Sequence, residues 1–327
     1  MANIGVIMPT SMQKAIFSEE ARKRLEALGR VRWNETDAHL TVEEARSFLQ
    51  DCEVGVGSWR TPGPRREILD GCPGLKLWVH AAGSVKGFFT DDLRGRDLII
   101  ASCAPAIAKT VAEMVLGEII IGLRRIIPNA QQNRTERRPP VPNKLYLAAA
   151  TVGVVGASQV GRTLLSLLRP FAPRVLLYDP YITKEDAASL GAEKVDSLLK
   201  LCRECDAITM HTPLTDQTRR MIGAEHFQAM KDDAVFINSS RGGCIDERAL
   251  IAELEKGRLF AFLDVSDPEP ADMDNPIRTL PNVIYTSHLA GGASIHIGNQ
   301  VVEDVQAYLN GQKPKMAVTW DMLDRLA

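Results

Sequence analysis

The sequence predicts an α/β protein made of two doubly wound parallel sheets, and three observations lead to that fold class. Short apolar β runs alternate with amphipathic stretches along most of the chain, as expected for parallel strands joined by crossover helices. One run, Thr151–Val155, leads through a glycine-rich turn into a helical stretch, which is typical of such sheets. The chain has 327 residues, 45% of them hydrophobic, which is enough for about two hydrophobic cores.

The first third of the chain supplies the strands of the first predicted sheet. They are Ile4–Met8, Val54–Gly57, Leu77–Val79 and Leu98–Ala101. The apolar stretch Ile107–Ile127 follows, and it predicts a long buried helix. A membrane span is not predicted there, because the stretch carries four charged residues, namely Lys109, Glu113, Glu118 and Arg124.

The rest of the chain supplies a second sheet and a return to the first. The polar, proline-rich residues 129–143 are either a disordered linker or an arm, and their length favours an arm or interface loop. About six strands follow, at Thr151–Val155, Val175–Tyr178, Ala207–His211, Ala234–Asn238, Ala261–Asp264 and Val283–Thr286. A last helix near Ile295–Leu309 and the WDML segment after it are expected to return to the first domain. The predicted domains are therefore 1–105 with 297–327, and 106–296.

Charge and cysteine usage exclude several classes of protein. A formal net charge of -2 gives no electrostatic reason to expect a nucleic acid or an anionic membrane as partner. The N-terminus lacks a basic region and a cleavage site, and is expected to be the first strand. The six scattered cysteines suit reduced thiols in a cytoplasm. Cys202 and Cys205 form a CxxC, for which helix packing is favoured over a metal or redox role, and no metal site is expected.

The turn after Thr151–Val155 has the spacing of a phosphate-binding turn. Gly156 allows the tight turn, and Gly161 lets the following helix pack against the strand. Ser158 replaces the usual middle glycine, which hinders backbone approach slightly but adds a hydroxyl donor. Gln159 and Val160 open the helix, whose free amides are expected to receive a pyrophosphate. The turn therefore predicts a bound dinucleotide.

Asp179 ends the next predicted strand, 18 residues beyond Gly161. A carboxylate there accepts hydrogen bonds from the adenosine ribose and repels a 2′-phosphate. The following Pro180 and Tyr181 supply no arginine for such a phosphate, so NAD is favoured over NADP. The alternative is that Asp179 only forms the turn before the proline.

Arg241, Glu269 and His288 follow in an order that suits chemistry at a carbonyl next to a carboxylate. Arg241 comes directly after a predicted buried strand, and its guanidinium can bind a carboxylate and polarise a carbonyl. His288 can donate or accept a proton, and Glu269 can stabilise the imidazolium. Taken singly, Arg241 also fits a surface arginine and Glu269 a solvated loop acid. Together they predict hydride transfer between a dinucleotide and a 2-keto or 2-hydroxy acid.

On these residues the chain resembles the D-isomer-specific 2-hydroxyacid dehydrogenases, the family of the phosphoglycerate and glyoxylate/hydroxypyruvate enzymes. The likeness is densest between His211 and Gly291, in the motifs HTPLT, INSSRGG, LDV and TSHLAG. It implies two Rossmann-like domains, a discontinuous flavodoxin-like substrate domain and an inserted NAD-binding domain. It also implies a homodimer formed through the coenzyme domain and its arm.

The resemblance implies a role for each candidate residue. Arg241 would bind the carboxylate and carbonyl oxygen of the substrate, with His288 as the acid/base and Glu269 as its paired carboxylate. Asp264 would hold the nicotinamide carboxamide. The remaining cofactor residues would be Thr212 and Pro213 on the adenosine side, and Ser239 and Gly291 at the nicotinamide end.

A loop in the first domain, made of Ala82, Gly83 and Ser84, would receive the substrate carboxylate. Here the chain departs from the family pattern. Ala82 and Ser84 replace glycines, Lys86 replaces an aspartate, and Ser102 replaces an asparagine. The basic residues Arg60, Arg65, Arg66 and Lys86 suit a phosphorylated or dicarboxylic substrate and equally a solvated rim, so the acid that is used stays undetermined. Trp59, beside Arg60, suits an apolar substituent or the same rim.

The predicted function is NAD-dependent hydride transfer between nicotinamide and C2 of a small D-2-hydroxy or 2-keto acid. Two other functions share this scaffold. A formate dehydrogenase resembles a variant with glutamine in place of Glu269, which the sequence disfavours. A non-catalytic NAD-sensing protein can keep the same residues, but nothing in the chain suggests a DNA-binding appendage, and fold alone does not decide function.

Overall fold

The computed structural model describes residues 1–137 and 145–325, and these form two compact units. Unit 1 comprises Met1–Ile107 and Gly292–Ala327, and unit 2 comprises Ala108–Gly291. Each unit is built around its own sheet, in which nearly all strands run parallel. The predicted α/β class with two doubly wound sheets is therefore confirmed.

The sheet of unit 1 has the strand order β13-β5-β4-β3-β1-β2. Its strands are β1 (Ala2–Val6), β2 (Gly29–Trp33), β3 (Val54–Gly57), β4 (Leu77–His80), β5 (Ile99–Ser102) and β13 (Ala317–Val318). The five strands β1 to β5 are parallel in the flavodoxin-like order, whereas β13 pairs antiparallel with β5.

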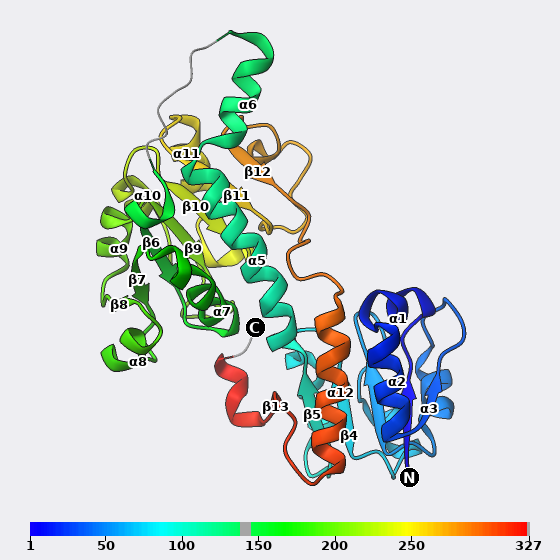
Figure 1. The fold of residues 1–327 in the computed structure, drawn as a ribbon. Coiled ribbons are helices and arrows are strands. Elements are labelled where there is room, and N and C mark those ends of the chain that lie inside the picture. The colour runs from blue at the N-terminus through cyan, green and yellow to red at the C-terminus, as the bar shows by residue number, and fades with distance from the viewer. Residues whose placement is uncertain (138–144, 326–327) are drawn as a thin grey trace. The chain divides into compact units, whose positions relative to one another are not determined.

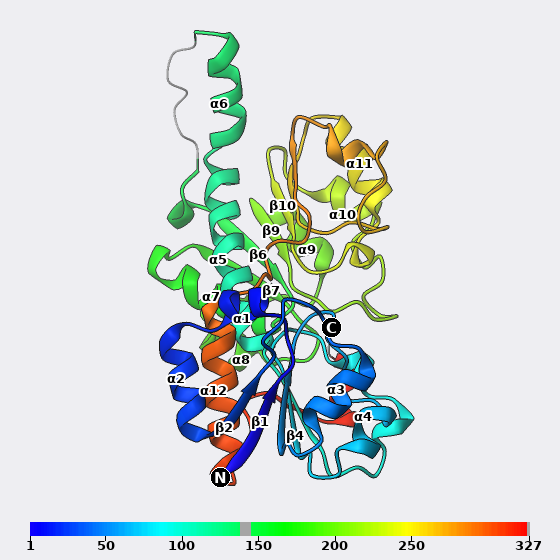
Figure 2. The ribbon, with the colours of Figure 1, turned by 90° about the vertical axis from the view of Figure 1, so that its right-hand side faces the viewer.

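Helices cover both faces of this sheet, as Figure 2 shows. On one face, α1 (Thr10–Ile16), α2 (Glu19–Leu28) and α12 (Ile295–Leu309) bury side chains against β1, β3 and β4. On the other, α3 (Val42–Leu49) and α4 (Arg66–Gly71) pack against Trp78 and Ile100. The helix near the C-terminus thus returns to the first sheet, and α12 has the bounds that the sequence predicts.

The sheet of unit 2 has the order β12-β11-β10-β9-β6-β7-β8, which is the Rossmann order extended by one strand. Its strands are β6 (Thr151–Val155), β7 (Arg174–Tyr178), β8 (Glu193–Lys194), β9 (Ala207–Met210), β10 (Val235–Asn238), β11 (Phe260–Leu263) and β12 (Val283–Tyr285). All of the pairings are parallel. The carboxyl ends of these strands therefore meet at one edge, where ligands bind in such folds.

Helices also cover the two faces of the second sheet (Figure 1). On one face, α9 (Leu198–Glu204), α10 (Ala224–Ala229) and α11 (Glu247–Glu255) bury side chains against Ile208, Phe236 and Leu263. The other face receives α5 (Ala104–Leu123), where Gly122 lies so close to Val235 and Phe262 that a Cβ atom would collide with Val235. The elements α7 (Gln159–Leu168) and α8 (Lys184–Ser189) follow β6 and β7.

Two predictions about elements were wrong, namely the end of the long helix and the number of strands in the second sheet. The long helix ends at Leu123 rather than Ile127, because Arg125 adopts a left-handed backbone (φ 53°) before α6 (Ile126–Thr135) begins. Residues 129–135 of the predicted arm are therefore helical, and residues 138–144 lie outside the described residues. The second sheet has seven strands instead of about six, because the two-residue strand β8 is too short to give a pattern.

The edge strand β2 also escaped the sequence analysis, and its composition explains why. Its sequence, GRVRW, alternates basic and apolar residues, since an edge strand is only half covered by the protein. The strands Val54–Gly57 and Thr151–Val155 have the predicted bounds, and the bounds of the remaining predicted strands differ by one or two residues. Among the described residues, no helix is long and apolar enough to cross a membrane.

Candidate active site

The turn between β6 and α7 brings the backbone close to neighbouring strands at two glycines. Gly156 has a φ of 99°, and a Cβ atom there would lie 2.8 Å from the carbonyl oxygen of His211. A Cβ atom on Gly161 would lie 2.1 Å from the carbonyl oxygen of Gly156. Ser158 caps α7, since its hydroxyl oxygen accepts a hydrogen bond from the Gly161 amide at 3.4 Å. Both glycines are therefore required by close packing.

The Asp179 carboxylate is fixed at this turn. It accepts a hydrogen bond from the Ala157 amide at 2.7 Å and another from the Tyr181 amide at 2.8 Å. The second contact is the turn-forming one that the sequence analysis weighed as an alternative, and the first connects the end of β7 to the glycine-rich turn. Asp179 thus forms the local turn and also borders the site predicted for a ribose.

Thr212 and Pro213 follow β9 and stand beside the same turn. A Cβ atom on Gly156 would lie 3.1 Å from Cγ2 of Thr212, so the two residues are adjacent. The carbonyl oxygen of Pro213 accepts a hydrogen bond from the Thr218 hydroxyl at 2.6 Å, which fixes the segment. Gln159 and Val160 lie in the first turn of α7. The predicted phosphate and adenosine residues therefore come together at the carboxyl edge of the second sheet.

Arg241 lies directly after β10 in a half-buried position. Its Nη1 donates to the carbonyl oxygen of Ser240 at 2.6 Å, and Nδ2 of Asn238 donates to the Arg241 carbonyl oxygen at 3.1 Å. Within residues 1–137 and 145–325, no carboxylate stands within ion-pair distance of its guanidinium. The cation is thus available for an anion from outside the chain.

Glu269 and His288 come together over 19 residues of sequence. Nδ1 of His288 lies 2.6 Å from Oε1 of Glu269, and both side chains are partly exposed. His288 has a left-handed backbone (φ 52°), which is uncommon outside glycine and is often found at functional sites. The amide of His288 donates to the carbonyl oxygen of Asp264 at 2.8 Å, and this bond helps to hold the unusual conformation.

Asp264 organises the loop that carries His288. Its buried carboxylate accepts hydrogen bonds from the Thr286 hydroxyl at 2.6 Å, the Leu289 amide at 2.8 Å and the Ala290 amide at 3.0 Å. Gly291 follows immediately. Asp264 was predicted as a cofactor residue and Thr286 was not, although a threonine at the end of a predicted strand is a signal for such a contact.

Three buried polar atoms near this edge have no hydrogen-bond partner in the described chain, namely Oε2 of Glu118, Nδ1 of His211 and the hydroxyl of Ser239. Glu118 lies inside α5 and is only 7% exposed. Burial, together with the negative charge of Asp264, raises the pKa of Glu118 to about 8. The sequence predicted no role for Glu118, whose charge within an apolar helix was used only to argue against a membrane span.

The predicted substrate loop belongs to unit 1, whereas Arg241, Glu269, His288 and the cofactor residues belong to unit 2. Ala82 is buried and its amide already donates to the carbonyl oxygen of His80 at 2.7 Å, while the hydroxyl of Ser102 donates to the Gly83 carbonyl oxygen. His80 is buried, its Nδ1 has no partner in the described chain, and burial lowers its pKa to about 4. The loop is therefore held from within, and Ala82 does not offer a free amide.

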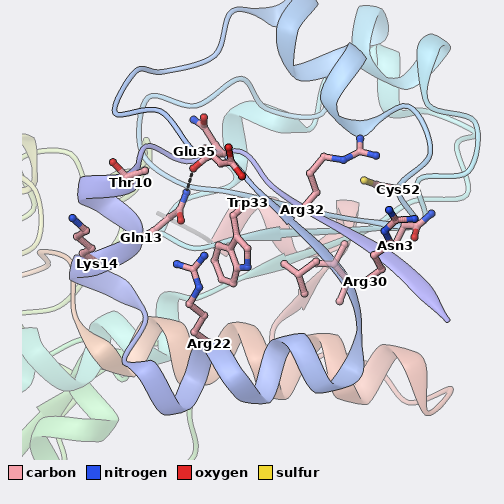
Figure 3. Close-up of a pocket in the computed structure, with 13 residues that line it drawn as sticks. Asn3, Thr10, Gln13, Lys14, Arg22, Arg30, Arg32, Trp33, Glu35 and Cys52 are labelled. Carbon is pink, nitrogen blue, oxygen red and sulfur yellow. Dashed lines mark hydrogen bonds between the residues drawn. The ribbon is translucent and has the colours of Figure 1, made fainter.

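A groove of about 410 Å³ runs along β2 in unit 1 and contains none of the predicted site residues (Figure 3). It is lined by basic side chains, of which Arg22 lies over the Trp33 ring and pairs with Glu26. Arg32 pairs with Asp51. Neighbouring acids thus neutralise part of the positive charge, and the groove adds no residue to the candidate site.

The cysteines and possible metal ligands can also be placed. All six cysteines lie in the described part of the chain, and each is a buried free thiol. Burial raises the pKa of both Cys202 and Cys205, which makes these thiols poor nucleophiles and metal ligands. Across the described residues, no group of three or more histidine, cysteine, aspartate or glutamate side chains is arranged to hold a metal ion.

Residues 116–290, more than half of the chain, match the family model described as "D-isomer specific 2-hydroxyacid dehydrogenase, NAD binding domain". The chain belongs to this family. The resemblance inferred from the motifs between His211 and Gly291 is therefore confirmed. NAD is the cofactor of the matched domain.

Individual members of the D-2-hydroxyacid dehydrogenase family cover most of this chain. A D-3-phosphoglycerate dehydrogenase of Methanocaldococcus jannaschii is 34% identical over 302 residues, covering 90% of this chain and 56% of the relative. Glyoxylate/hydroxypyruvate reductase B of Escherichia coli K12 is 28% identical over 261 residues, covering 78% and 79%. The crystal structure of a phosphoglycerate oxidoreductase from Rhizobium etli has 25% identity and a TM-score of 0.78, covering 97% and 98%. The chain spans about half the length of the phosphoglycerate dehydrogenases that it matches, 56% and 49%.

Proposed function

We propose that this protein is an NAD-dependent oxidoreductase that transfers a hydride between nicotinamide and C2 of a small D-2-hydroxy or 2-keto acid. The observation that carries the proposal is the His288–Glu269 pair, with 2.6 Å between Nδ1 and Oε1, which leaves the other ring nitrogen free for a substrate proton. The family of the chain and the names of its relatives support the same reaction class.

In this proposal Arg241 binds the substrate. A guanidinium is always charged and presents a planar fork that suits a carboxylate and the carbonyl oxygen beside it. The contact of Nη1 with the Ser240 carbonyl oxygen occupies one edge of the fork and fixes its direction. The remaining donors would hold the 2-keto acid and stabilise the negative charge that develops on its carbonyl oxygen during reduction.

His288 moves the proton. During reduction of the keto acid, Nε2 of His288 would donate a proton to the developing alkoxide, and during oxidation it would remove the hydroxyl proton. Glu269 would accept the Nδ1 hydrogen, which sets the orientation of the ring and stabilises the imidazolium form. The backbone bond from His288 to Asp264 would hold the ring in register with the cofactor residues.

The residues of unit 2 fit a dinucleotide. Gly156 and Gly161 leave no room for a Cβ atom, and Asp179 is fixed beside them, as expected for a turn that receives a pyrophosphate and a ribose. Ser158, Gln159, Val160, Gly161, Thr212 and Pro213 would contact the phosphates and the adenosine, and Ser239, Asp264 and Gly291 the nicotinamide. When bound, the cofactor supplies or accepts the hydride. The preference for NAD over NADP, through Asp179, is part of the proposal.

Residues 1–105 with 297–327 would form the substrate domain and 106–296 the coenzyme domain. Within the substrate domain, the loop from Ala82 to Ser84 would orient the substrate carboxylate. Gly83 and Ser84 would do so through the backbone, because the Ala82 amide is already engaged. We further propose that the protein is cytoplasmic and forms a homodimer. Sedimentation analysis of the purified protein tests the dimer directly.

The test is the oxidation of NADH with a panel of 2-keto acids: glyoxylate, hydroxypyruvate, phenylpyruvate, 2-oxoglutarate and phosphohydroxypyruvate. We expect turnover with at least one acid, and a loss of about 10²- to 10⁴-fold in kcat for His288→Ala. Arg241→Ala is expected to lose kcat/KM severely. If Arg241→Ala retains near-normal kcat/KM, the assignment of the substrate site is wrong. If NADH binds but no acid turns over, a non-catalytic NAD-sensing protein becomes the better explanation.

A further inference from the structure

Glu118 is a buried acid that the proposed reaction does not use. It is 7% exposed, and its Oε2 atom has no hydrogen-bond partner in the described chain. A buried carboxyl group without a partner is costly unless it stays protonated or meets a ligand. Such a group, in unit 2 with the proposed cofactor residues, calls for a functional explanation.

The register of the helix and of two strands places Glu118 at the carboxyl edge of the second sheet. Gly122, one turn further along α5, contacts Val235 and Phe262, so Glu118 belongs to the same sheet-facing side of the helix. Side chains two residues apart on a strand share a face, so Asp264 lies on the same face as Phe262 and nearer the carboxyl end. On the sheet face that α5 covers, Glu118 therefore lies nearer than Gly122 to the carboxyl ends of the strands, on the side of Asp264.

Among the charged groups near Glu118, Asp264 is the one whose charge changes the pKa of Glu118. Lys109 and Glu113, on α5 itself, are exposed. Asp264 accepts three hydrogen bonds from its own loop and makes none with Glu118, so the two carboxyl groups do not share a proton directly. The negative charge of Asp264 nevertheless opposes ionisation of Glu118 and reinforces the effect of burial.

Arg241 and His288 follow β10 and β12 at the same edge, and neither adds to the displacement of the Glu118 pKa, whose causes are burial and Asp264. The Ser239 hydroxyl, directly after β10, is another buried polar atom without a partner in the described chain. Two unsatisfied polar atoms and one satisfied anion thus stand where the proposed function puts the nicotinamide.

We propose that Glu118 is a proton-linked partner of the nicotinamide ring, which stays protonated beside the neutral reduced ring and ionises beside the cationic oxidised ring. The inference rests on the proposed function, since Asp264 and Ser239 mark the nicotinamide position. When NAD⁺ binds, the Glu118 carboxyl group would release one proton to solvent, and its carboxylate would face the pyridinium charge. When the ring gains a hydride from the substrate and loses its charge, Glu118 would take one proton back from solvent.

The physical reason is that the free site already lies close to the point of ionisation. The pKa of Glu118 is raised to about 8, so a small change in local charge moves its protonation near neutral pH. A full positive charge within about 7 Å, at an effective dielectric constant of about 20, changes a proton affinity by tenfold or more. By linkage, the affinity for NAD⁺ must then rise by the same factor as the pH increases.

Calorimetric titration of the full-length protein with NAD⁺ and with NADH, in buffers of different ionisation enthalpy, counts the protons exchanged without any turnover. For the wild type between pH 7 and 8 we expect release of about half to one proton per NAD⁺ and close to none per NADH. From pH 6.5 to 9 the affinity for NAD⁺ should rise about tenfold, while that for NADH should change less than twofold.

Glu118→Gln keeps the shape and the neutral form but cannot ionise, so both its proton release and the pH dependence of NAD⁺ affinity should disappear. The same two proteins are also compared in a His288→Asn background, which removes the imidazole that the proposed function assigns to proton transfer. Glu113→Gln, an exposed change on the same helix, is the matched control and should behave as wild type.

The outcomes separate this inference from the proposed function. If wild-type protein binds neither NAD⁺ nor NADH, the proposed function fails. If both bind, and wild type and Glu118→Gln release equal numbers of protons in the His288→Asn background, the role of Glu118 is refuted and the dehydrogenase proposal stands. Should Glu118→Gln fail to fold, proton release by the His288→Asn protein alone decides the question, because absence of release there also refutes the role.

Discussion

Replacing Glu118 by glutamine should make the protein more stable at alkaline pH, and the size of the effect follows from its buried position. The pKa of Glu118 is raised to about 8 in the folded protein, against an ordinary value of 4.5 for a glutamate side chain. The folded state therefore holds a proton that the unfolded state releases between these values. The free energy of unfolding contributed by this group is fully present below pH 4.5 and is lost as the pH rises through 8.

The magnitude of the loss is about 1.4 kcal/mol per pH unit across that interval, or about 4 to 5 kcal/mol in total. Such an amount is a large fraction of the stability of a domain. Glutamine has nearly the same volume and no charge, so Glu118→Gln should unfold at a similar urea concentration at pH 5 and at a clearly higher one at pH 8.5.

The assay is urea denaturation followed by far-ultraviolet circular dichroism at pH 5, 7 and 8.5. All four tryptophans, Trp33, Trp59, Trp78 and Trp320, lie in unit 1, so tryptophan fluorescence follows that unit as an internal reference. Glu113→Gln, exposed on α5, should track the wild type at every pH. A constant difference between Glu118→Gln and wild type from pH 5 to 8.5 would show that Glu118 is ionised throughout, and would refute the reasoning.

Three further predictions concern the candidate site. Gly156→Ala should abolish NADH binding in a calorimetric titration, because residue 156 has a φ of 99° and its Cβ atom would lie 2.8 Å from the carbonyl oxygen of His211. The control is Gly117→Ala in α5, which has open space around it and should bind NADH normally. Thr286→Val should lower the free energy of unfolding by about 1 to 3 kcal/mol in urea, because it removes a 2.6 Å hydrogen bond to the buried Asp264 carboxylate; unchanged stability would contradict this role. Arg241→Lys should lose about 10- to 100-fold in kcat/KM for the best keto acid, because a lysine keeps the charge but not the planar fork. Full activity would show that the substrate needs only a positive charge at this position.

Local patterns account for the parts of this protein that the sequence predicts well. The strand Thr151–Val155 and the helix Ile295–Leu309 are found with the bounds expected, because continuous apolar or amphipathic periodicity marks them without help from tertiary contacts. The edge strand β2 is only half covered and has no continuous apolar run, and β8 has only two residues, so neither strand was predicted. The helix break at Arg125 was placed two residues too late because the nearest proline, Pro128, lies inside the first turn of α6 rather than at the break itself.

The sequence by itself determined the fold class, the family and the residue types of the candidate chemistry, since motif spacing and strand–turn–helix order are local properties of the chain. Only the tertiary structure decided which groups meet: the contact of Glu269 with His288, the three hydrogen bonds that hold Asp264, and the engaged amide of Ala82. The state of Glu118 belongs to the same class. Its proton affinity depends on burial between α5 and the second sheet and on the charge of Asp264, which lies 146 residues away in the chain. These are properties of the folded protein that no local pattern encodes.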